Sequence, residues 1–280
     1  MTAPKTAGCM SPGLLKVVER ARREPEGQLR SLAHLIDEQA LERAFYRLRA
    51  NAAVGVDGVS RDQYELGLRD RLQDLHQGMK AMQWNQQPIL RRHIPKEQGG
   101  IRPIGISATE DKVVQGALTE VLEAIYEQDF LDCSYGFRPG RSAHDAIRRL
   151  DNAIHREEIS WILEADIKSF FDSVNRGQLE EMLQIRVADS SLMRLIGKCL
   201  HVGVLDGEDF SRPEEGTPQG SVISPILGNV YLHYTLDLWF ERDIRPRLAG
   251  RTLLVRYADD FVMGFERRDD AERVMAVLGK

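Results

Sequence analysis

Two adjacent carboxylates stand between apolar runs in the segment Leu253-Leu254-Val255-Arg256-Tyr257-Ala258-Asp259-Asp260-Phe261-Val262-Met263. This pattern predicts a strand, a tight turn and a second strand, with the acids at the tip. A two-residue hairpin turn normally favours Asn-Gly or Asp-Gly, so a second aspartate there indicates a requirement for charge. Like charges side by side raise each other's pKa unless a cation lies between them, and a divalent metal ion is the usual cation. Because aspartate is also a common turn residue, the segment by itself fits a solvated turn equally well.

Length and composition are those of an ordinary globular chain. The 280 residues exceed the usual size of one domain, which predicts two subdomains. Hydrophobic residues make up 42% and charged residues 29%, as is typical of soluble proteins. No segment approaches about 18 uninterrupted apolar residues, and residues 1–11 lack an apolar targeting core, so we expect a cytoplasmic protein without a membrane span. The net charge of −5 weighs against a nucleic-acid binder, which is typically basic.

Hydrophobic periodicity predicts a mixture of helices and strands around the acidic hairpin. The first 25 residues are polar and interrupted by proline and glycine, so they are expected to form a loosely ordered lead-in. Helices are expected over residues 29–48, 63–78, 110–126, 142–155 and 176–185. Strands are expected over 88–96 and 101–106, joined by a glycine turn, and over 161–167.

A third acid, Asp166, closes the apolar strand predicted over residues 161–167. By itself it fits a turn or a helix cap. Its meaning changes beside Asp259 and Asp260, because all three acids lie where an apolar strand ends or turns. If these strands are neighbours in one sheet, the carboxylates converge. Three aspartates at one sheet edge suit Mg²⁺, which completes its shell with water and substrate phosphates, and two such ions support phosphoryl transfer.

Two loops rich in glycine and proline each allow two interpretations. The loop Gly216–Pro225 opens onto the apolar run Ile226–Leu238 and fits a helix start with proline in the first turn; its small residues also permit close approach of a ligand. The loop Ser134–Ser142 carries Arg138 and Arg141 just before a predicted helix. It fits a turn with its last serine as N-cap, or a place that holds phosphates.

Five motifs follow one another along the chain: Ile94-Pro95-Lys96 with Arg102-Pro103-Ile104, Tyr135–Ser142, Asp166–Asp172, Gly216–Ser221 and Tyr257–Asp260. In this order, across roughly residues 30 to 265, they resemble the reverse transcriptase of bacterial group II introns. The stretch Asn51–Tyr64 also looks like the N-terminal extension of that family, which separates it from retroviral enzymes.

This resemblance implies an α+β fold built from the fingers and palm of a right-hand polymerase, with an antiparallel palm sheet packed on helices. It divides the chain into a lead-in (1–25), a helical N-terminal extension (26–84), fingers (85–160) and a palm that is incomplete at its C-terminus (161–280). The family continues with a thumb or maturase domain, so we expect the thumb to be absent and the chain to be truncated. A basic surface in that further part would account for the acidic net charge.

The resemblance also assigns the metal site. Asp166, Asp259 and Asp260 match the catalytic, metal-binding carboxylates of the family. Ile167 would contribute its backbone carbonyl to a metal ion. The implied cofactor is a pair of Mg²⁺ ions, with Mn²⁺ as a substitute.

Four further residues match the positions that bind the incoming nucleotide. Lys96 and Arg102, on either side of a hairpin turn, match residues that grip the triphosphate. Phe171 matches the aromatic gate that excludes a ribose 2′-hydroxyl. Gln219 matches the residue that contacts the nucleotide beside the templating base.

These roles imply an RNA-directed DNA polymerase that adds dNTPs to a DNA primer 3′-hydroxyl on an RNA template, in the mobility of its intron RNA. Catalysis would rest on positioning and electrostatics. Alternatives are an RNA-binding maturase or splicing factor with an idle polymerase site, an inactive truncated remnant, and an RNA-directed RNA polymerase. The intact acids favour the DNA polymerase over a maturase, and Phe171 argues against the RNA polymerase.

Overall fold

The computed structural model describes residues 10–95 and 99–279. The chain divides into two compact units: Met1–Gln128 with Phe171–Ser224 form unit 1, and Asp129–Phe170 with Pro225–Lys280 form unit 2. Two subdomains are therefore found, as the length predicted. The predicted fingers (85–160) and palm (161–280) each contribute to both units, and their boundaries stay predictions.

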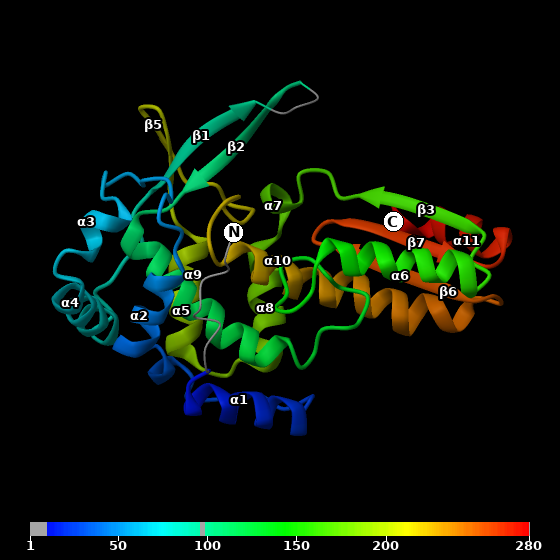
Figure 1. The fold of residues 1–280 in the computed structure, drawn as a ribbon, viewed down its shortest axis with the longest axis horizontal. Helices are drawn as coiled ribbons and strands as arrows, with labels where there is room; N and C mark the ends of the chain where they lie inside the picture. Colours follow the sequence, from blue (N-terminus) through cyan, green and yellow to red (C-terminus); the bar gives the residue numbers. More distant parts are fainter. Residues whose placement is uncertain (1–9, 96–98, 280) are drawn as a thin grey trace. The chain divides into compact units, whose positions relative to one another are not determined.

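The sheet of unit 1 contains the predicted hairpin. Strand β1 (Ile89–Pro95) pairs antiparallel with β2 (Ile101–Ile106), and its other edge pairs parallel with β4 (Val204–Asp206). A short hairpin from β4 to β5 (Asp209–Ser211) completes the order β2-β1-β4-β5. Figure 1 shows the β1–β2 hairpin extending away from the helices of this unit.

The helices of unit 1 pack around α5 (Thr109–Tyr126), most of whose residues are buried. Four helices contact it: α1 (Pro12–Arg23), α2 (Glu38–Arg47), α3 (Arg61–Glu65) and α9 (Ser190–Leu200). Unit 1 also contains η1 (Ala33–Leu35), α4 (Leu68–Lys80) and α8 (Arg176–Arg186), and the short α7 (Phe170–Ser173) begins at the boundary of the units.

Two predicted helices of unit 1 differ from the structure. The helix expected over residues 29–48 is α-helical only over Glu38–Arg47, because the Asp37 side chain accepts a hydrogen bond from Ala40 N and starts the helix there. The helix expected over residues 63–78 is divided into α3 and α4 by Gly67, whose φ of 75° is left-handed. The helices predicted over 110–126 and 176–185 are confirmed.

The predicted lead-in is the clearest correction. Residues Pro12–Arg23 form α1, capped by the Ser11 hydroxyl, and the helix buries Leu14 and Ala21. Proline at the first helical position is favourable because its fixed φ suits the helix and its missing N–H has no partner to lose. Pro12 therefore starts a helix, where the sequence analysis took it as an interruption.

Unit 2 is an antiparallel sheet packed on helices, in agreement with the predicted α+β fold. Its strands β3 (Trp161–Asp166), β6 (Thr252–Tyr257) and β7 (Asp260–Phe265) lie in the order β3-β7-β6. Helix α6 (Ala143–Arg156) packs on β6, and α11 (Arg268–Leu278) packs on β3 and β7.

The apolar run after the loop Gly216–Pro225 forms a long helical element with mixed geometry. It begins as α10 (Ser224–Leu232), so the predicted helix start is confirmed. It continues as the π-helical segments η2 (His233–Asp237) and η3 (Trp239–Ile244), and ends in the 3₁₀ turn η4 (Arg245–Arg247). Across residues 10–95 and 99–279, no helix has both the length and the apolar character that crossing a membrane requires.

We expect Leu14→Ala to lower the free energy of unfolding by about 2–5 kcal/mol, because it removes a buried side chain from the contact between α1 and the rest of unit 1. The neighbouring Leu15 is 47% exposed, so Leu15→Ala is the matched control and should change stability by less than about 0.5 kcal/mol. Urea unfolding measures both. Equal small effects would show that α1 is not packed as described.

Candidate active site

The predicted strand, tight turn and strand are present, but only Asp259 of the two acids is in the turn, because Asp260 begins β7. Tyr257 pairs with Asp260 across the β6–β7 ladder, so Ala258 and Asp259 are the two turn residues. Ala258 has a φ of 57°, a left-handed value, whereas Asp259 does not. A positive φ at the first central residue alone is the pattern of a type II′ turn, where glycine is usual. An alanine in this left-handed conformation raises the conformational energy of the turn by about 1–2 kcal/mol, so contacts from other residues must stabilise the turn.

The sheet brings the predicted carboxylates together. Asp166, the last residue of β3, lies directly opposite Asp260, the first residue of β7. Directly opposed residues of an antiparallel pair share a face, with Cβ atoms about 4.5–5.5 Å apart. Asp259 precedes Asp260 in the turn, and Ile167 follows Asp166. The two strands are therefore neighbours in one sheet, and Asp166 and Asp260 lie opposite each other, whereas the convergence of all three acids stays a prediction.

The acids line a groove in unit 2. Asp166 and Asp260 open into a cavity of about 460 Å³. Its walls include Ile147 and Leu150 of α6 and Tyr257 of β6. The groove gives a substrate room beside the carboxylates.

The donor set fits a magnesium ion that is completed by its substrate. In the part of the chain that the structure describes, no group of three His, Cys, Asp or Glu side chains forms a ready metal cage. Mg²⁺ is usually held by one or two carboxylates together with water and substrate phosphates. The opposed pair Asp166 and Asp260 supplies two carboxylates for such an ion. The predicted group of three carboxylates is not assembled among the described residues, so the role of Asp259 as a metal ligand stays a prediction.

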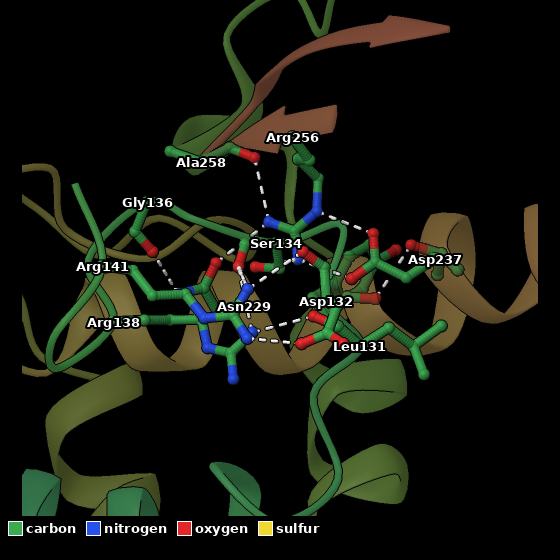
Figure 2. A network of polar contacts seen from close by, with 12 residues as sticks. Leu131, Asp132, Ser134, Gly136, Arg138, Arg141, Asn229, Asp237, Arg256 and Ala258 are labelled. Carbon is green, nitrogen blue, oxygen red and sulfur yellow. Dashed lines mark hydrogen bonds and ion pairs between the residues drawn. The ribbon is translucent and has the colours of Figure 1, made fainter. Parts of the chain in front are cut away.

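A buried arginine is hydrogen-bonded to the turn and to other segments of unit 2 (Figure 2). The Arg256 side chain is completely inaccessible, and its Nε and Nη2 donate to the two carboxylate oxygens of Asp237 at 2.7 and 2.6 Å. Nη1 donates to the Ala258 carbonyl at 3.0 Å and to Asn229 Oδ1 at 2.9 Å. Nη2 also donates to Ser134 Oγ at 2.9 Å. The guanidinium thus joins the turn to three other segments of unit 2.

The arginines of the loop Ser134–Ser142 are used inside the chain. Arg138 is buried and donates to the carbonyls of Leu131 and Ser134 at 2.8 and 2.9 Å. Arg141 forms an ion pair with Asp132 at 2.6 Å. The loop ends in a capping box at the start of α6, so the interpretation as a capped turn is confirmed, whereas the phosphate-holding interpretation finds no support in these contacts.

Unit 1 joins the segments that carry the predicted nucleotide-binding residues. Gly105 N donates to the Gln219 carbonyl at 2.6 Å, which ties β2 to the loop Gly216–Ser221. Thr217 N donates to the Phe171 carbonyl at 2.6 Å, which ties the same loop to α7. Arg102 is exposed on β2, opposite Ile94.

The remaining member of that predicted set, Lys96, lies outside the described residues. The side chains of Phe171 and Gln219 are both half-buried. The backbone bonds between β2, α7 and the loop Gly216–Ser221 place Arg102, Phe171 and Gln219 in one substructure of unit 1. The carboxylates belong to unit 2.

Arg176 was missed by the sequence analysis and shapes the Gln219 loop. Its Nε, Nη1 and Nη2 donate to the carbonyls of Gly216, Pro213 and Glu215 at 2.7, 2.7 and 3.1 Å. The side chain is 6% exposed, and burial lowers the pKa of the guanidinium. A signal was available, because Arg176 is the first residue of α8 and a cation is unfavourable at a helix N-terminus.

Comparison with known proteins establishes the family. The family described as "Reverse transcriptase (RNA-dependent DNA polymerase)" matches residues 94–280, which include all five motifs. The chain therefore belongs to the reverse transcriptase family. Its relatives confirm the resemblance to group II intron reverse transcriptases and maturases.

Protein YkfC of Escherichia coli (strain K12) is 34% identical over 282 residues, covering 89% of this chain and 74% of YkfC. The group II intron-encoded protein LtrA of Lactococcus lactis subsp. cremoris is 33% identical over 213 residues, covering 74% of this chain but only 35% of LtrA. A solved structure, "Partial Cas6-RT-Cas1--Cas2 complex", matches in fold with a TM-score of 0.50 and 20% identity, covering 89% of this chain and 43% of that chain.

A buried histidine beside the Arg256 network predicts acid sensitivity. His233 of η2 is 4% exposed, and its Nδ1 has no hydrogen-bond partner among the described residues. Burial lowers the pKa of His233 to about 4, against an opposing effect of Asp237. The unfolded chain binds this proton near pH 6.5 and the folded chain only near pH 4, so stability falls as pH falls through that window.

Between pH 7 and pH 5, we expect the unfolding free energy of the wild type to fall by about 2 kcal/mol more than that of His233→Asn. The lowered pKa of His233 in the folded chain supplies this difference, because one pKa unit corresponds to about 1.4 kcal/mol. Urea unfolding at each pH measures this difference. The control His155→Asn changes an exposed histidine of α6 and should follow the wild type. Parallel pH profiles for wild type and His233→Asn would contradict the prediction.

Proposed function

We propose that this chain is an RNA-directed DNA polymerase of the group II intron type, which adds dNTPs to a primer 3′-hydroxyl on an RNA template. The observation that supports this most directly is the register that sets Asp166 opposite Asp260, with Asp259 on the adjoining turn. In this proposal the RNA partners are the template and the intron RNA of the mobile element.

The proposed metal ligands are Asp166, Asp259 and Asp260, with the carbonyl of Ile167. Two Mg²⁺ ions, or Mn²⁺ in their place, would activate the primer hydroxyl and neutralise charge on the triphosphate when bound. The carboxylates themselves would attract and orient cationic ligands at the end of the β3–β7 ladder, where the strand pairing already sets Asp166 opposite Asp260 before the reaction. The adjoining groove leaves space for the primer end.

Unit 1 would supply the nucleotide contacts. Arg102, together with Lys96, would donate charge-assisted hydrogen bonds to the triphosphate. Gln219 would contact the nucleotide beside the templating base. Phe171 would exclude a 2′-hydroxyl by occupying the space that it needs, and the backbone bond from Thr217 to Phe171 supports this assignment by fixing the gate to the Gln219 loop.

We expect Asp166→Asn and Asp259→Asn each to lower single-nucleotide incorporation more than about 100-fold, a loss typical of removing a main electrostatic contact of a transition state. The assay supplies an RNA template, a DNA primer, dNTP and Mg²⁺ to the purified chain. Asp209→Asn changes an exposed aspartate of β5 in unit 1 and is the matched control. Failure of the wild-type chain to incorporate any nucleotide, or full activity of both variants, would overturn the proposed function.

The same variants separate the polymerase from a maturase that acts through RNA binding alone. An RNA-folding role needs no carboxylate at Asp166 or Asp259, so splicing assistance should survive both substitutions. Loss of dNTP incorporation with RNA binding retained assigns the acids to polymerisation.

We expect Phe171→Ala to raise rNTP incorporation relative to dNTP incorporation by about tenfold or more. The substitution replaces the ring that would block the 2′-hydroxyl with a small side chain. Removing one unfavourable contact of about 1.4 kcal/mol changes a rate ratio tenfold. Competition between dNTP and rNTP on one template measures the ratio. Phe210→Ala removes an exposed ring from β5 and should leave it unchanged. An unchanged ratio in Phe171→Ala would remove Phe171 from the gate.

A further inference from the structure

We propose that Arg256 is a positioning residue for the catalytic hairpin: it holds the Ala258 carbonyl so that the turn stays in its strained form and keeps Asp259 and Asp260 in place. Nothing in the family resemblance assigns this residue a role. The inference rests on the proposed function for its catalytic consequence. Its structural content, that Arg256 holds the turn, is testable without activity.

Two contacts hold the strained residue Ala258. Arg256 Nη1 donates to the Ala258 carbonyl at 3.0 Å. Gly136 packs against the same turn so closely that a Cβ at this position would clash with Ala258 N. A non-glycine residue keeps a left-handed conformation only where its surroundings determine it from several directions. Arg256 and Gly136 are those surroundings.

Asn229 couples the two contacts. Its side-chain oxygen accepts from Arg256 Nη1 at 2.9 Å, and its Nδ2 donates to the Gly136 carbonyl at 2.8 Å. Asn229 is 1% exposed, so water does not compete for either bond. Figure 2 shows Asn229 between Gly136 and the Arg256 guanidinium. One amide therefore fixes both supports of the Ala258 turn relative to each other.

Asp237 fixes the direction of the guanidinium. The two carboxylate oxygens accept from Nε and Nη2 in a bidentate pair, and both side chains are completely buried. A planar fork held on one edge presents its remaining donors in a set direction. In Arg256 that direction includes the carbonyl of Ala258.

The π-helical geometry of η2 explains how Asn229 and Asp237 reach the same arginine. At 3.6 residues per turn, eight residues would carry Asp237 about 80° past Asn229 around the helix axis. The π turn over His233–Asp237 has more residues per turn and so reduces this rotation. Both side chains can then face Arg256. Such π turns are frequent at functional sites.

A thermal double-mutant cycle tests whether Arg256 holds the turn. Ala258→Gly removes the left-handed strain and should raise the melting temperature of the wild type by about 2–4 °C. In the Arg256→Lys background the turn is free to relax, so the same change should raise it by less than half as much. Asp237→Asn removes the bidentate pair that directs the guanidinium toward the Ala258 carbonyl, and it provides a second background if Arg256→Lys does not fold. Equal gains from Ala258→Gly in every background would overturn the proposal.

Nucleotide incorporation tests the catalytic consequence. Arg256→Lys should lower kcat more than tenfold and change KM for dNTP less than threefold, because the proposed nucleotide contacts are in unit 1. Arg186→Lys is the matched control: Arg186 is 1% exposed, lies in unit 1 and donates to the carbonyls of Ala21 and Glu24. It should lower the melting temperature and leave kcat within twofold of wild type.

The two readouts separate this inference from the proposed function. A wild-type chain without incorporation defeats the polymerase proposal, and the melting cycle then still decides whether Arg256 holds the turn. A kcat within twofold of wild type in Arg256→Lys, in an active and folded chain, overturns the positioning role.

Discussion

The buried ion pair between Arg256 and Asp237 is the interaction on which unit 2 depends. Removing one partner from such a pair costs about 3–5 kcal/mol, because the other charge is left buried without compensation. Two apolar side chains could fill the space of this ion pair. Apolar side chains could not donate hydrogen bonds to a backbone carbonyl, a side-chain amide and a hydroxyl at once, as Arg256 does. The ion pair therefore organises loops as well as filling the interior.

Buried arginines perform a related task in unit 1. Arg176 satisfies three carbonyls of the loop before Gln219, and Arg186 satisfies carbonyls in the last turn of α1 and at its C-cap. Irregular backbone leaves carbonyl groups without the partners that helices and sheets provide, and an unpaired buried carbonyl is costly. A guanidinium has five donors and no acceptor, so one side chain can satisfy a whole loop. The loops that carry the candidate site are shaped in this way.

The sequence predicted the features that depend on local pattern. The strand pair around Asp259 and Asp260, the strand ending at Asp166 and the β1–β2 hairpin each combine an apolar run with a turn signal, and all three are present. Helix ends were harder, because Asp37 and Gly67 interrupt continuous apolar periodicity with a cap and a left-handed residue.

The supporting network could not be predicted from local pattern. Arg256 makes contacts with Asn229 and Ser134, which are 27 and 122 residues away in the sequence, and no local pattern encodes them. The only indication of this network in the sequence was the charge of Arg256 inside the apolar run Leu253–Tyr257, because an arginine is almost never fully buried unless it is paired.

The register of a single ladder decides whether the acids meet. Among the described residues, β3 is paired only with β7, so the position of Asp166 relative to Asp260 depends on that one set of strand contacts. Side chains alternate between faces along a strand, and a slip of one residue would turn Asp166 to the opposite face of the sheet. Insertion or deletion of one residue within β3 would therefore separate the acids even if the strand still formed. In this chain, the spacing of residues in β3 is as restricted as the identity of its last aspartate.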